Sequence, residues 1–402
     1  MANTLKFGNG EWATKEGSAL AYNDENGNFK PLPFDFTRAS NATRVGRNGL
    51  IETVGSNVPR IDFKDDSNGA LKLEPQRSNE LLYSEEFNNA AWSKTNSTIT
   101  ANDAVSPDGL TNADKITDNA NSTQHRVTQA ISVTSGTSYN ASIFVKNDDK
   151  GDFAINFTAA GFGSTQIVFN LINGTVTSGT GTIEDYGNGW YRISATAAAN
   201  VTGSGTIGFN LGDGGGYVGT GQSVFIWGAQ VEEGSYETSY IPTQGSQVTR
   251  VVDACSQTPP SGIIGQTEGV MYLDFILNTD TISTKWLSYL GDGSQYIGIY
   301  VVNTSNVIRL EIANTTNQAT FNSSFPITKG TRYKCAIAYA NNDFTAYING
   351  VQIGTDNSGT VPSTTTLRNY YNLNNIESTI INDLQLYNTR LSNAELAALT
   401  TI

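Results

Sequence analysis

The stretch FTAYINGVQIG at residues 344–354 contains two short runs of alternating side chains around the pair Asn349-Gly350. Successive side chains of a β-strand point to opposite faces, so each run would bury one face and leave the other in water. Asn-Gly accepts the positive φ angles that a two-residue hairpin turn requires. The stretch therefore predicts an antiparallel hairpin that packs on one side.

The same alternation recurs along most of the chain. It is found at residues 125–133, 139–146, 152–157, 166–171, 190–195 and 221–227, and again at 270–275, 296–301, 307–312, 332–339 and 384–387. One-sided alternation is typical of antiparallel sheets with one buried face. The 40 glycines, 18 tyrosines and 17 phenylalanines suit short strands joined by many turns. The chain is predicted to be all-β, with two antiparallel β-sandwich (jelly-roll) domains preceded by an extended N-terminal arm.

Changes in this pattern suggest the domain boundaries. Residues 1–78 hold few alternating runs and four prolines, which withhold ladder donors, so this segment is predicted to be an arm that docks on a partner. Residues 79–250 form the first predicted sandwich, residues 251–262 a linker stiffened by Pro259-Pro260, and residues 263–402 the second sandwich. Ser392 and Glu395 have the spacing of a capping box, which predicts a short C-terminal helix.

Charge and cysteine content limit the possible partners. The formal net charge of −13 would repel a phosphate backbone, so nucleic acid is not expected as a partner. Acidic loops could hold Ca²⁺, although a solvated acidic surface accounts for the same composition. Cys255 and Cys335 are 80 residues apart, which fits two buried thiols better than a disulfide framework or a zinc site. No signal-peptide core or membrane-length apolar run is seen, so the protein is expected to stay in the cytosol until something releases it.

Several motifs in the first sandwich resemble a module that is common in tailed-phage fibre and tail proteins. They are WGAQVEEG at residues 227–234, TSYIPT at 238–243, VTR at 248–250, LLYSEEF at 81–87 and GNGWYR at 187–192. That module is a jelly roll similar to carbohydrate-binding modules. Upstream, FTRASNATRV at residues 36–45, GLIE at 49–52 and LEPQR at 73–77 resemble the leader that precedes such modules.

The last part of the chain resembles a second family. YINGV at residues 347–351 and DLQLYNTRLSNAE at 383–395 are similar to concanavalin A-like (laminin G-like) sandwich modules. Together the two resemblances imply a fibre or spike protein of a phage particle, with glycans as the ligand class. A fold resemblance does not supply a function by itself, so the chemistry of individual residues has to be considered.

Catalytic groups are sparse. The chain has a single histidine, His125, which cannot form a multi-histidine metal site, and no Ser-His-Asp triad can be proposed without it. The pairs Glu85-Glu86 and Glu232-Glu233 would place their carboxylates on opposite faces of a strand, so neither forms a dyad by itself. The chain is therefore predicted not to be an enzyme. In the resembled family such pairs recur as scaffold, which implies Glu85 and Glu232 as ligands of a structural calcium ion, while no cofactor is required.

Aromatic side chains near loops of the second sandwich suggest a glycan site. Aromatic faces stack on sugar C–H surfaces, while amides and carboxylates hold the hydroxyl groups. The predicted glycan-binding residues are Trp286, Tyr289, Asp292, Tyr296, Tyr370 and Tyr371. Packing in the core or against loops would explain the same aromatic residues, and that alternative stays open.

The function predicted from these observations is a structural and binding component of a bacteriophage virion, as a head or tail fibre or spike. It would be assembled in the host cytoplasm, form a homo-oligomer such as a trimer, contact other virion proteins through the arm and bind host surface glycans without inserting into a membrane. One alternative is a secreted glycan-binding accessory module of a bacterial polysaccharide-active protein, against which the missing signal peptide argues. Another is a depolymerising spike, for which neither a catalytic dyad nor β-helix repeats are seen.

Overall fold

The computed structural model describes residues 4–25, 28–259, 262–278, 284–369 and 378–402. These residues form antiparallel sheets and, within the described ranges, two short helices, so the predicted all-β class is confirmed. None of the described helices is long and apolar enough to cross a membrane.

Two compact units divide the chain, and each is built from separated segments. The C-terminal unit contains residues Met1–Asn41, Val54–Gln76 and Val251–Ile402, and the central unit contains Ala42–Thr53 and Arg77–Arg250. The chain therefore passes between the units four times. These units differ from the predicted boundaries, which assumed that each domain is one continuous stretch of sequence.

The central unit is a sandwich of two six-stranded sheets. The first sheet has the order β10 (Ser93–Thr95), β14 (Arg126–Val133), β21 (Gly203–Leu211), β16 (Asp152–Thr158), β17 (Thr165–Asn170) and β18 (Thr175–Ser178). The second has the order β11 (Ser97–Val105), β12 (Thr111–Asp118), β23 (Ser223–Glu233), β15 (Ser138–Asn147), β20 (Trp190–Ala198) and β19 (Gly181–Asp185). Smaller elements are β13 (Ser122–Thr123), β22 (Tyr217–Val218), β9 (Arg77–Asn79), β24 (Val248–Arg250) and α1 (Ala159–Phe162).

Alternate residues of these strands fill the space between the two sheets. On β16, for example, Phe153, Ile155 and Phe157 are buried in the main core cluster. A second cluster forms where the hairpin of β5 (Ala42–Val45) and β6 (Ile51–Val54) packs on Phe144, Trp190, Trp227 and Tyr240. Part of the predicted arm is therefore a component of the central unit.

The C-terminal unit is one continuous ladder of paired strands. Its order is β30 (Thr316–Asn322), β29 (Val307–Asn314), β28 (Gln295–Val302), β27 (Lys285–Asp292), β34 (Leu367–Asn369), β25 (Ala254–Gln257), β4 (Asn28–Thr37), β3 (Ser18–Glu25), β1 (Leu5–Gly8), β35 (Thr379–Tyr387), β26 (Glu268–Leu277), β31 (Arg332–Ala340), β32 (Asp343–Ile348) and β33 (Val351–Asp356). β2 (Ala13–Lys15) pairs with β3, and β8 (Ala70–Leu73) joins β7 (Arg60–Asp62) to β35.

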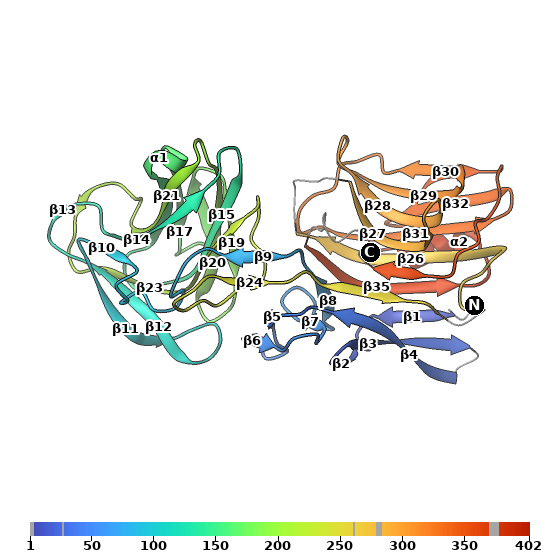
Figure 1. Ribbon diagram of the computed structural model, residues 1–402, viewed down its shortest axis with the longest axis horizontal. Helices are drawn as coiled ribbons and strands as arrows, with labels where there is room; N and C mark the ends of the chain where they lie inside the picture. The colour runs from blue at the N-terminus through green and yellow to red at the C-terminus, as the bar shows by residue number, and fades with distance from the viewer. Residues whose placement is uncertain (1–3, 26–27, 260–261, 279–283, 370–377) are drawn as a thin grey trace. The chain divides into compact units, whose positions relative to one another are not determined.

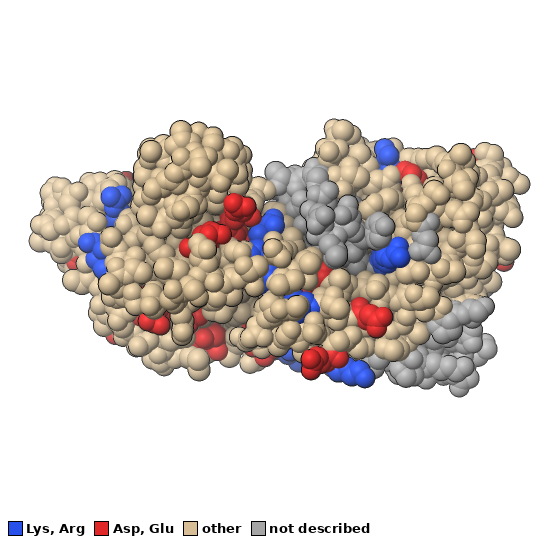
Figure 2. Space-filling view, in the orientation of Figure 1, with Lys and Arg blue, Asp and Glu red and all other residues tan. Residues whose placement is uncertain are grey.

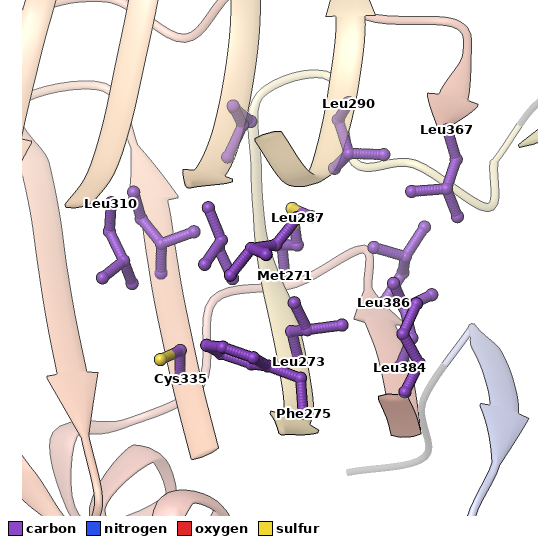
Figure 3. Packing of buried hydrophobic residues seen from close by; sticks show 14 of the residues in the cluster. Met271, Leu273, Phe275, Leu287, Leu290, Leu310, Cys335, Leu367, Leu384 and Leu386 are labelled. Atoms are coloured by element: carbon purple, nitrogen blue, oxygen red, sulfur yellow. The ribbon is translucent and has the colours of Figure 1, made fainter. Parts of the chain in front are cut away.

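Both halves of this ladder contribute to one hydrophobic core. Met271, Leu273 and Phe275 of β26 face the same space as Leu287 and Leu290 of β27, as Figure 3 shows. The ladder therefore folds back on itself into two layers. The predicted second sandwich is present, with more strands than residues 263–402 alone supply.

The structure corrects the prediction that residues 1–78 form an extended arm. β1 pairs with β35, and β3 and β4 continue from it toward β25, so the first strands join the two layers along one edge (Figure 1). The rings of Phe7 and Phe34 are fully buried and stacked, with centroids 4.5 Å apart. Proline-rich sequence had suggested little autonomous structure, but β4 pairs with β3 on one side and, on the other, with β25, which follows the central unit in the sequence.

Within the predicted linker, residues 251–262, β25 (Ala254–Gln257) is a strand of this sandwich. β25 lies between β34 and β4, and Cys255 on it is buried. Just before it, Asp253 is fully buried and accepts hydrogen bonds from the guanidinium groups of Arg38 and Arg60. A buried carboxylate needs such partners, so this charge cluster fixes the segment rather than leaving it solvated.

The C-terminal helix agrees with its prediction. α2 (Asn393–Thr400) begins with a complete capping box, because Ser392 accepts from the Glu395 backbone and the Glu395 carboxylate accepts from the Ser392 backbone. Leu391 and Leu396 share one apolar cluster with residues of β26 and β31. Cys255 and Cys335 are both buried, as predicted.

Candidate functional site

The outer face of β27, β28, β29 and β30 carries aromatic and polar side chains in register. A bulge in β27 between Trp286 and Ser288 turns both Trp286 and Tyr289 to this face, although they are three residues apart. Opposing residues then form three rows across the strands. The first row is Trp286, Tyr300, Arg309 and Asn322; the second is Tyr289, Gly298, Glu311 and Thr320; the third is Gly291, Tyr296, Ala313 and Asn317. We call these three rows the aromatic face.

Trp286 is the centre of the aromatic face. Its ring centroid lies 4.2 Å from that of Tyr300 and 5.0 Å from those of Tyr289 and Tyr296. The indole lies over Gly298, where an added Cβ would come within 2.3 Å of the ring atom Cζ3. Trp286 and Tyr296 are half-buried, so each keeps part of its ring toward solvent. The absence of a side chain at position 298 thus leaves room for the indole to lie against the backbone of β28.

A buried carboxylate organises the tyrosines. The hydroxyl groups of Tyr296 and Tyr300 each donate to one oxygen of Glu311. The side chain of Glu311 is 9% exposed, so these two bonds compensate for the loss of water. Burial is the larger cause and the hydrogen bond to Glu311 the next, and together they raise the pKa of Tyr300 to about 12. The Tyr300 hydroxyl therefore stays protonated at neutral pH. Burial raises the pKa of Tyr296 in the same direction.

Arg309 supplies the positive charge of the aromatic face. Its Nε donates to Asn322 Oδ1 at 2.8 Å, and its Nη1 lies 3.4 Å from the Tyr300 hydroxyl and 3.7 Å from Glu311 Oε2. The side chain is 30% exposed, which leaves guanidinium N–H groups accessible from solvent. The face therefore offers aromatic ring surface next to a charged donor.

Three of the six predicted glycan-binding residues come together here. Trp286, Tyr289 and Tyr296 share the aromatic face, although Tyr289 is buried and its hydroxyl donates to the Gly293 carbonyl at 3.0 Å. Asp292 ends β27 opposite Gln295, and its side chain is not described. Tyr370 and Tyr371 lie outside the described residues.

Sequence reasoning missed Tyr300, Arg309 and Glu311, and also the role of Gly298 in making room for the Trp286 ring. The signal was present in two alternating runs, since Tyr296, Gly298 and Tyr300 occupy every second position of β28 and Arg309 and Glu311 do so on β29. Selecting residues by aromatic type and nearness to loops overlooked the polar partners on the neighbouring strand. The bulge in β27, which sets the register, has no clear mark in the sequence.

The central unit contains a cleft of about 650 Å³. Its lining consists of Glu85, Glu86, Asn102, Asn112, Pro242, Thr243, Gln244, Ser246 and Val248. Glu85 accepts a hydrogen bond from the Tyr240 hydroxyl at 2.9 Å, and burial raises the pKa of its carboxyl group. One of the two predicted calcium ligands therefore lies in a cleft.

The second predicted calcium ligand has other partners. Glu232 is fully buried and accepts from the backbone and the hydroxyl of Thr238, both at 2.6 Å, and from Gln230 at 3.1 Å. These bonds fix the turn that follows β23 and leave little coordination capacity. Among the described residues, no group of three or more His, Cys, Asp and Glu side chains is placed to hold a metal ion. These surroundings do not fit a calcium site at Glu232.

The single histidine is a structural residue. His125 is fully buried, and its two ring nitrogens lie 2.6 Å from the Asn96 carbonyl and 3.1 Å from the Tyr217 carbonyl. Its ring also packs on Tyr217, with centroids 4.5 Å apart. His125, which directly precedes β14, therefore connects the turn at Asn96 to β22.

Charged side chains are sparse on the surface. Figure 2 shows a face on which neutral residues predominate and the acidic and basic groups are scattered. This agrees with the 15% of charged residues in the chain. Neutral polar and apolar groups therefore make up most of the face shown in Figure 2.

Comparison with protein families gives a match in the C-terminal unit. Residues 275–397 match the model of the Concanavalin A-like lectin/glucanases superfamily. The C-terminal unit contains a lectin-like module. The matched residues run from β26 into α2 and include every strand of the aromatic face. None of the curated proteins compared with the chain matches it.

Solved structures with similar folds come from different sources. The CBM40 module of the Ruminococcus gnavus IT-sialidase bound to α2,3 sialyllactose is 16% identical, covers 34% of this chain and 84% of its own, and has a TM-score of 0.30. The SAP-like pentraxin of Limulus polyphemus is 13% identical over 33% of this chain and 70% of its own, with a TM-score of 0.28. The botulinum neurotoxin serotype D binding domain is 12% identical over 37% of this chain and 40% of its own, with a TM-score of 0.32.

Proposed function

We propose that this chain is a non-enzymatic structural and binding component of a bacteriophage virion, and that its lectin-like module binds host surface glycans through the aromatic face. The observation that carries the proposal is the position of Trp286, which lies partly exposed over Gly298 and packs on Tyr296 and Tyr300, with Arg309 next to Tyr300 in the same row. A flat aromatic ring with adjacent hydrogen-bond donors is the usual composition of a small-molecule site that recognises sugars.

The size of the aromatic face fits a short oligosaccharide. Neighbouring strands lie about 4.8 Å apart, so Trp286 on β27 and Arg309 on β29 are separated by about 10 Å. One partly exposed ring pair supports a weak complex, with a dissociation constant near millimolar, or about 4 kcal/mol. Several copies on one particle would raise the apparent affinity without any new contact.

The virion assignment is supported by the two sequence resemblances rather than by the aromatic face. The motifs at residues 36–45, 81–87 and 227–234 resemble phage leader and jelly-roll segments, and the lectin-like module follows them in the chain. The single histidine is buried against two carbonyl groups, and Glu232 is fixed by Thr238, so neither is placed for general acid–base work.

An oligomer is part of the same proposal. Fibres and spikes are usually symmetric assemblies, and we propose a trimer that contacts other virion proteins. Because β1, β3 and β4 are paired within the C-terminal unit, the contact surface would have to be found elsewhere than in a free arm. Multi-angle light scattering of the full chain tests this, and a monomer at micromolar concentration would contradict it.

The binding experiment uses the full chain and a matched pair of glycine variants. Gly298→Ala places a methyl group 2.3 Å from the Trp286 ring, whereas ordinary contact begins at 3.4 Å, so the indole must move by at least about 1 Å. Gly55→Ala is the control, because its Cβ would meet only one atom, at 4.0 Å. Binding to host cells and to a glycan array should fall at least tenfold in Gly298→Ala and in Trp286→Ala, and stay unchanged in Gly55→Ala.

Two results would refute the proposal. If Trp286→Ala binds glycans as well as the unchanged chain does, the aromatic face is not the site. Purified phage particles that lack the chain, as judged by immunogold labelling, would refute the virion assignment independently of glycan binding.

A further inference from the structure

We infer that the aromatic face selects glycans that carry a sugar carboxylate, and that Arg309 is the residue that recognises this group. The inference rests on the proposed glycan binding and names the ligand class of the same site. It follows from the hydrogen-bond partners of the two charged residues of the face, Arg309 and Glu311.

Glu311 is not available to a ligand. Its two carboxylate oxygens accept from Tyr296 and Tyr300, and its side chain is 9% exposed. A sugar hydroxyl would have to displace a tyrosine to reach it. Glu311 is therefore a positioning residue that holds the two rings, and it contributes no accessible acceptor to the face.

Arg309 has unused donors. Nε is bonded to Asn322, and Nη1 makes one long contact of 3.4 Å with Tyr300. Within the part of the chain that the structure describes, Nη2 has no hydrogen-bond partner. The bond to Asn322 and the packing of the guanidinium over the Tyr300 ring, 5.8 Å from its centroid, fix the group in place. Less conformational entropy is then lost when a ligand binds.

The free donors of Arg309 suit a carboxylate better than a hydroxyl group. A guanidinium offers N–H groups in a planar fork that matches two carboxylate oxygens, and charge-assisted bonds are about twice as strong as neutral ones. Glu311 Oε2 offsets part of the positive charge from 3.7 Å, but its orientation toward the tyrosines leaves the outward side of Arg309 positive. A ring stacked on Trp286 would place a substituent of the next sugar near Arg309, about two strand spacings away.

The test uses paired glycans that differ in the carboxylate. Three pairs of glycans are titrated into the full chain by NMR or calorimetry. The first pair ends in glucuronate or in glucose, the second ends in galacturonate or in galactose, and the third is sialyllactose and lactose. We expect at least one acidic member to bind tenfold more tightly than its neutral partner. Raising NaCl from 50 to 500 mM should reduce this preference, because the interaction between exposed charges is screened.

Variants separate recognition from a general charge effect. Arg309→Gln should abolish the acidic preference while neutral glycans still bind, and Asn322→Ala should reduce it because Arg309 loses its anchor. Lys15→Gln removes one positive charge from an exposed position of the same unit and should leave the preference intact. Thermal unfolding of each variant checks that the fold is retained.

Four outcomes would overturn the inference. Equal affinity of all acidic and neutral partners would do so, as would an acidic preference that persists in Arg309→Gln. Binding of neutral glycans alone would refute the carboxylate while leaving the proposed function intact. If no glycan binds the unchanged chain, the proposed function and this inference fail together, and the glycan array with the unchanged chain shows this before the paired titration.

Discussion

Removal of the buried carboxylate of Asp253 is the sharpest test of how the C-terminal unit is built. Asp253 is fully buried and accepts from Arg38 Nη1 at 3.2 Å, from Arg60 Nη2, and from the Glu74 backbone at 2.9 Å. These partners come from the ends of β4, β7 and β8, whereas Asp253 precedes β25. One side chain thus joins the N-terminal segments of this unit to the segment that follows the central unit.

The magnitude follows from the charges that Asp253→Ala would leave behind. Arg38 and Arg60 are fully buried, and Glu74 remains a carboxylate partner of Arg60 through a 2.6 Å bond. Breaking a buried ion pair by removing one partner costs about 3–5 kcal/mol. For a unit of this size, each kcal/mol lowers the melting temperature by about 2–4 °C, so we expect a fall of roughly 6–20 °C.

The assay combines thermal unfolding with hydrogen exchange. Glu11→Ala is the control, because its ion pair with Lys6 is at the surface and should contribute no more than about 1 kcal/mol. In Asp253→Ala, amide exchange should accelerate together in β1, β4, β26 and β35, because these strands belong to one core. Faster exchange confined to residues 1–78, or a melting temperature lowered by less than 2 °C, would show that the N-terminal strands are a separable arm after all.

Two further predictions concern the same unit. Burial raises the pKa of the Asp383 carboxyl from 3.8 to about 6, so the folded state holds this proton more tightly and its stability should fall as pH rises from about 4 to about 6. In urea unfolding, Asp383→Asn should remove that fall, with a gain in stability of up to about 3 kcal/mol at pH 7 and none below pH 4. A variant that is less stable than the unchanged chain at pH 7 would contradict this. Ser392→Ala removes the cap of α2 and should cost about 1 kcal/mol, measured by the same unfolding curves against the conservative variant Ser392→Thr, which should lose much less.

The strands were predictable because their signal is local. Alternation in runs such as Phe344–Ile348 and the turn residues Asn349-Gly350 depend only on neighbours in sequence, and the structure places β32 and β33 there. The capping box at Ser392 is local in the same way. Such features need no knowledge of the partner strand, which is why class, turns and the terminal helix followed from the residues alone.

The domain plan was not predictable by the same means, because pairing partners leave no local mark. β4 carries Pro31 and Pro33, which argued against a strand, yet its register with β25 and β3 places it inside the ladder. The alternating burial of Phe34 and Phe36 becomes meaningful only once β25 lies beside them. Prolines are tolerated in a strand where their missing N–H is not required by the ladder, and this depends on register rather than composition.

Only some residues of the candidate site could be predicted, because the others reach it through pairing between strands. Aromatic type and loop position identified Trp286 and Tyr296, but Arg309 and Glu311 reach the same face only through cross-strand register. Gly298 contributes through its missing side chain, and the sequence does not show which ring fills the space that this leaves. Side chains that act through neighbours on other strands therefore need the structure to be found.

The strand order also connects the N-terminal segment to the aromatic face. β27, which carries Trp286, pairs with β34 on its other edge, and β34 pairs with β25, which in turn pairs with β4. A fragment that begins at residue 263 would lack β25, β4, β3 and β1, so the edge of β34 would be unpaired and the rings of Phe7, Phe34 and Phe36 would be missing from the core. The fragment would keep β28 and β34, the two strands that pair with β27, but β34 would have no partner on its other edge. The lectin-like module therefore shares its core and one sheet edge with the first strands of the chain, so the proposed binding is best measured on the full chain.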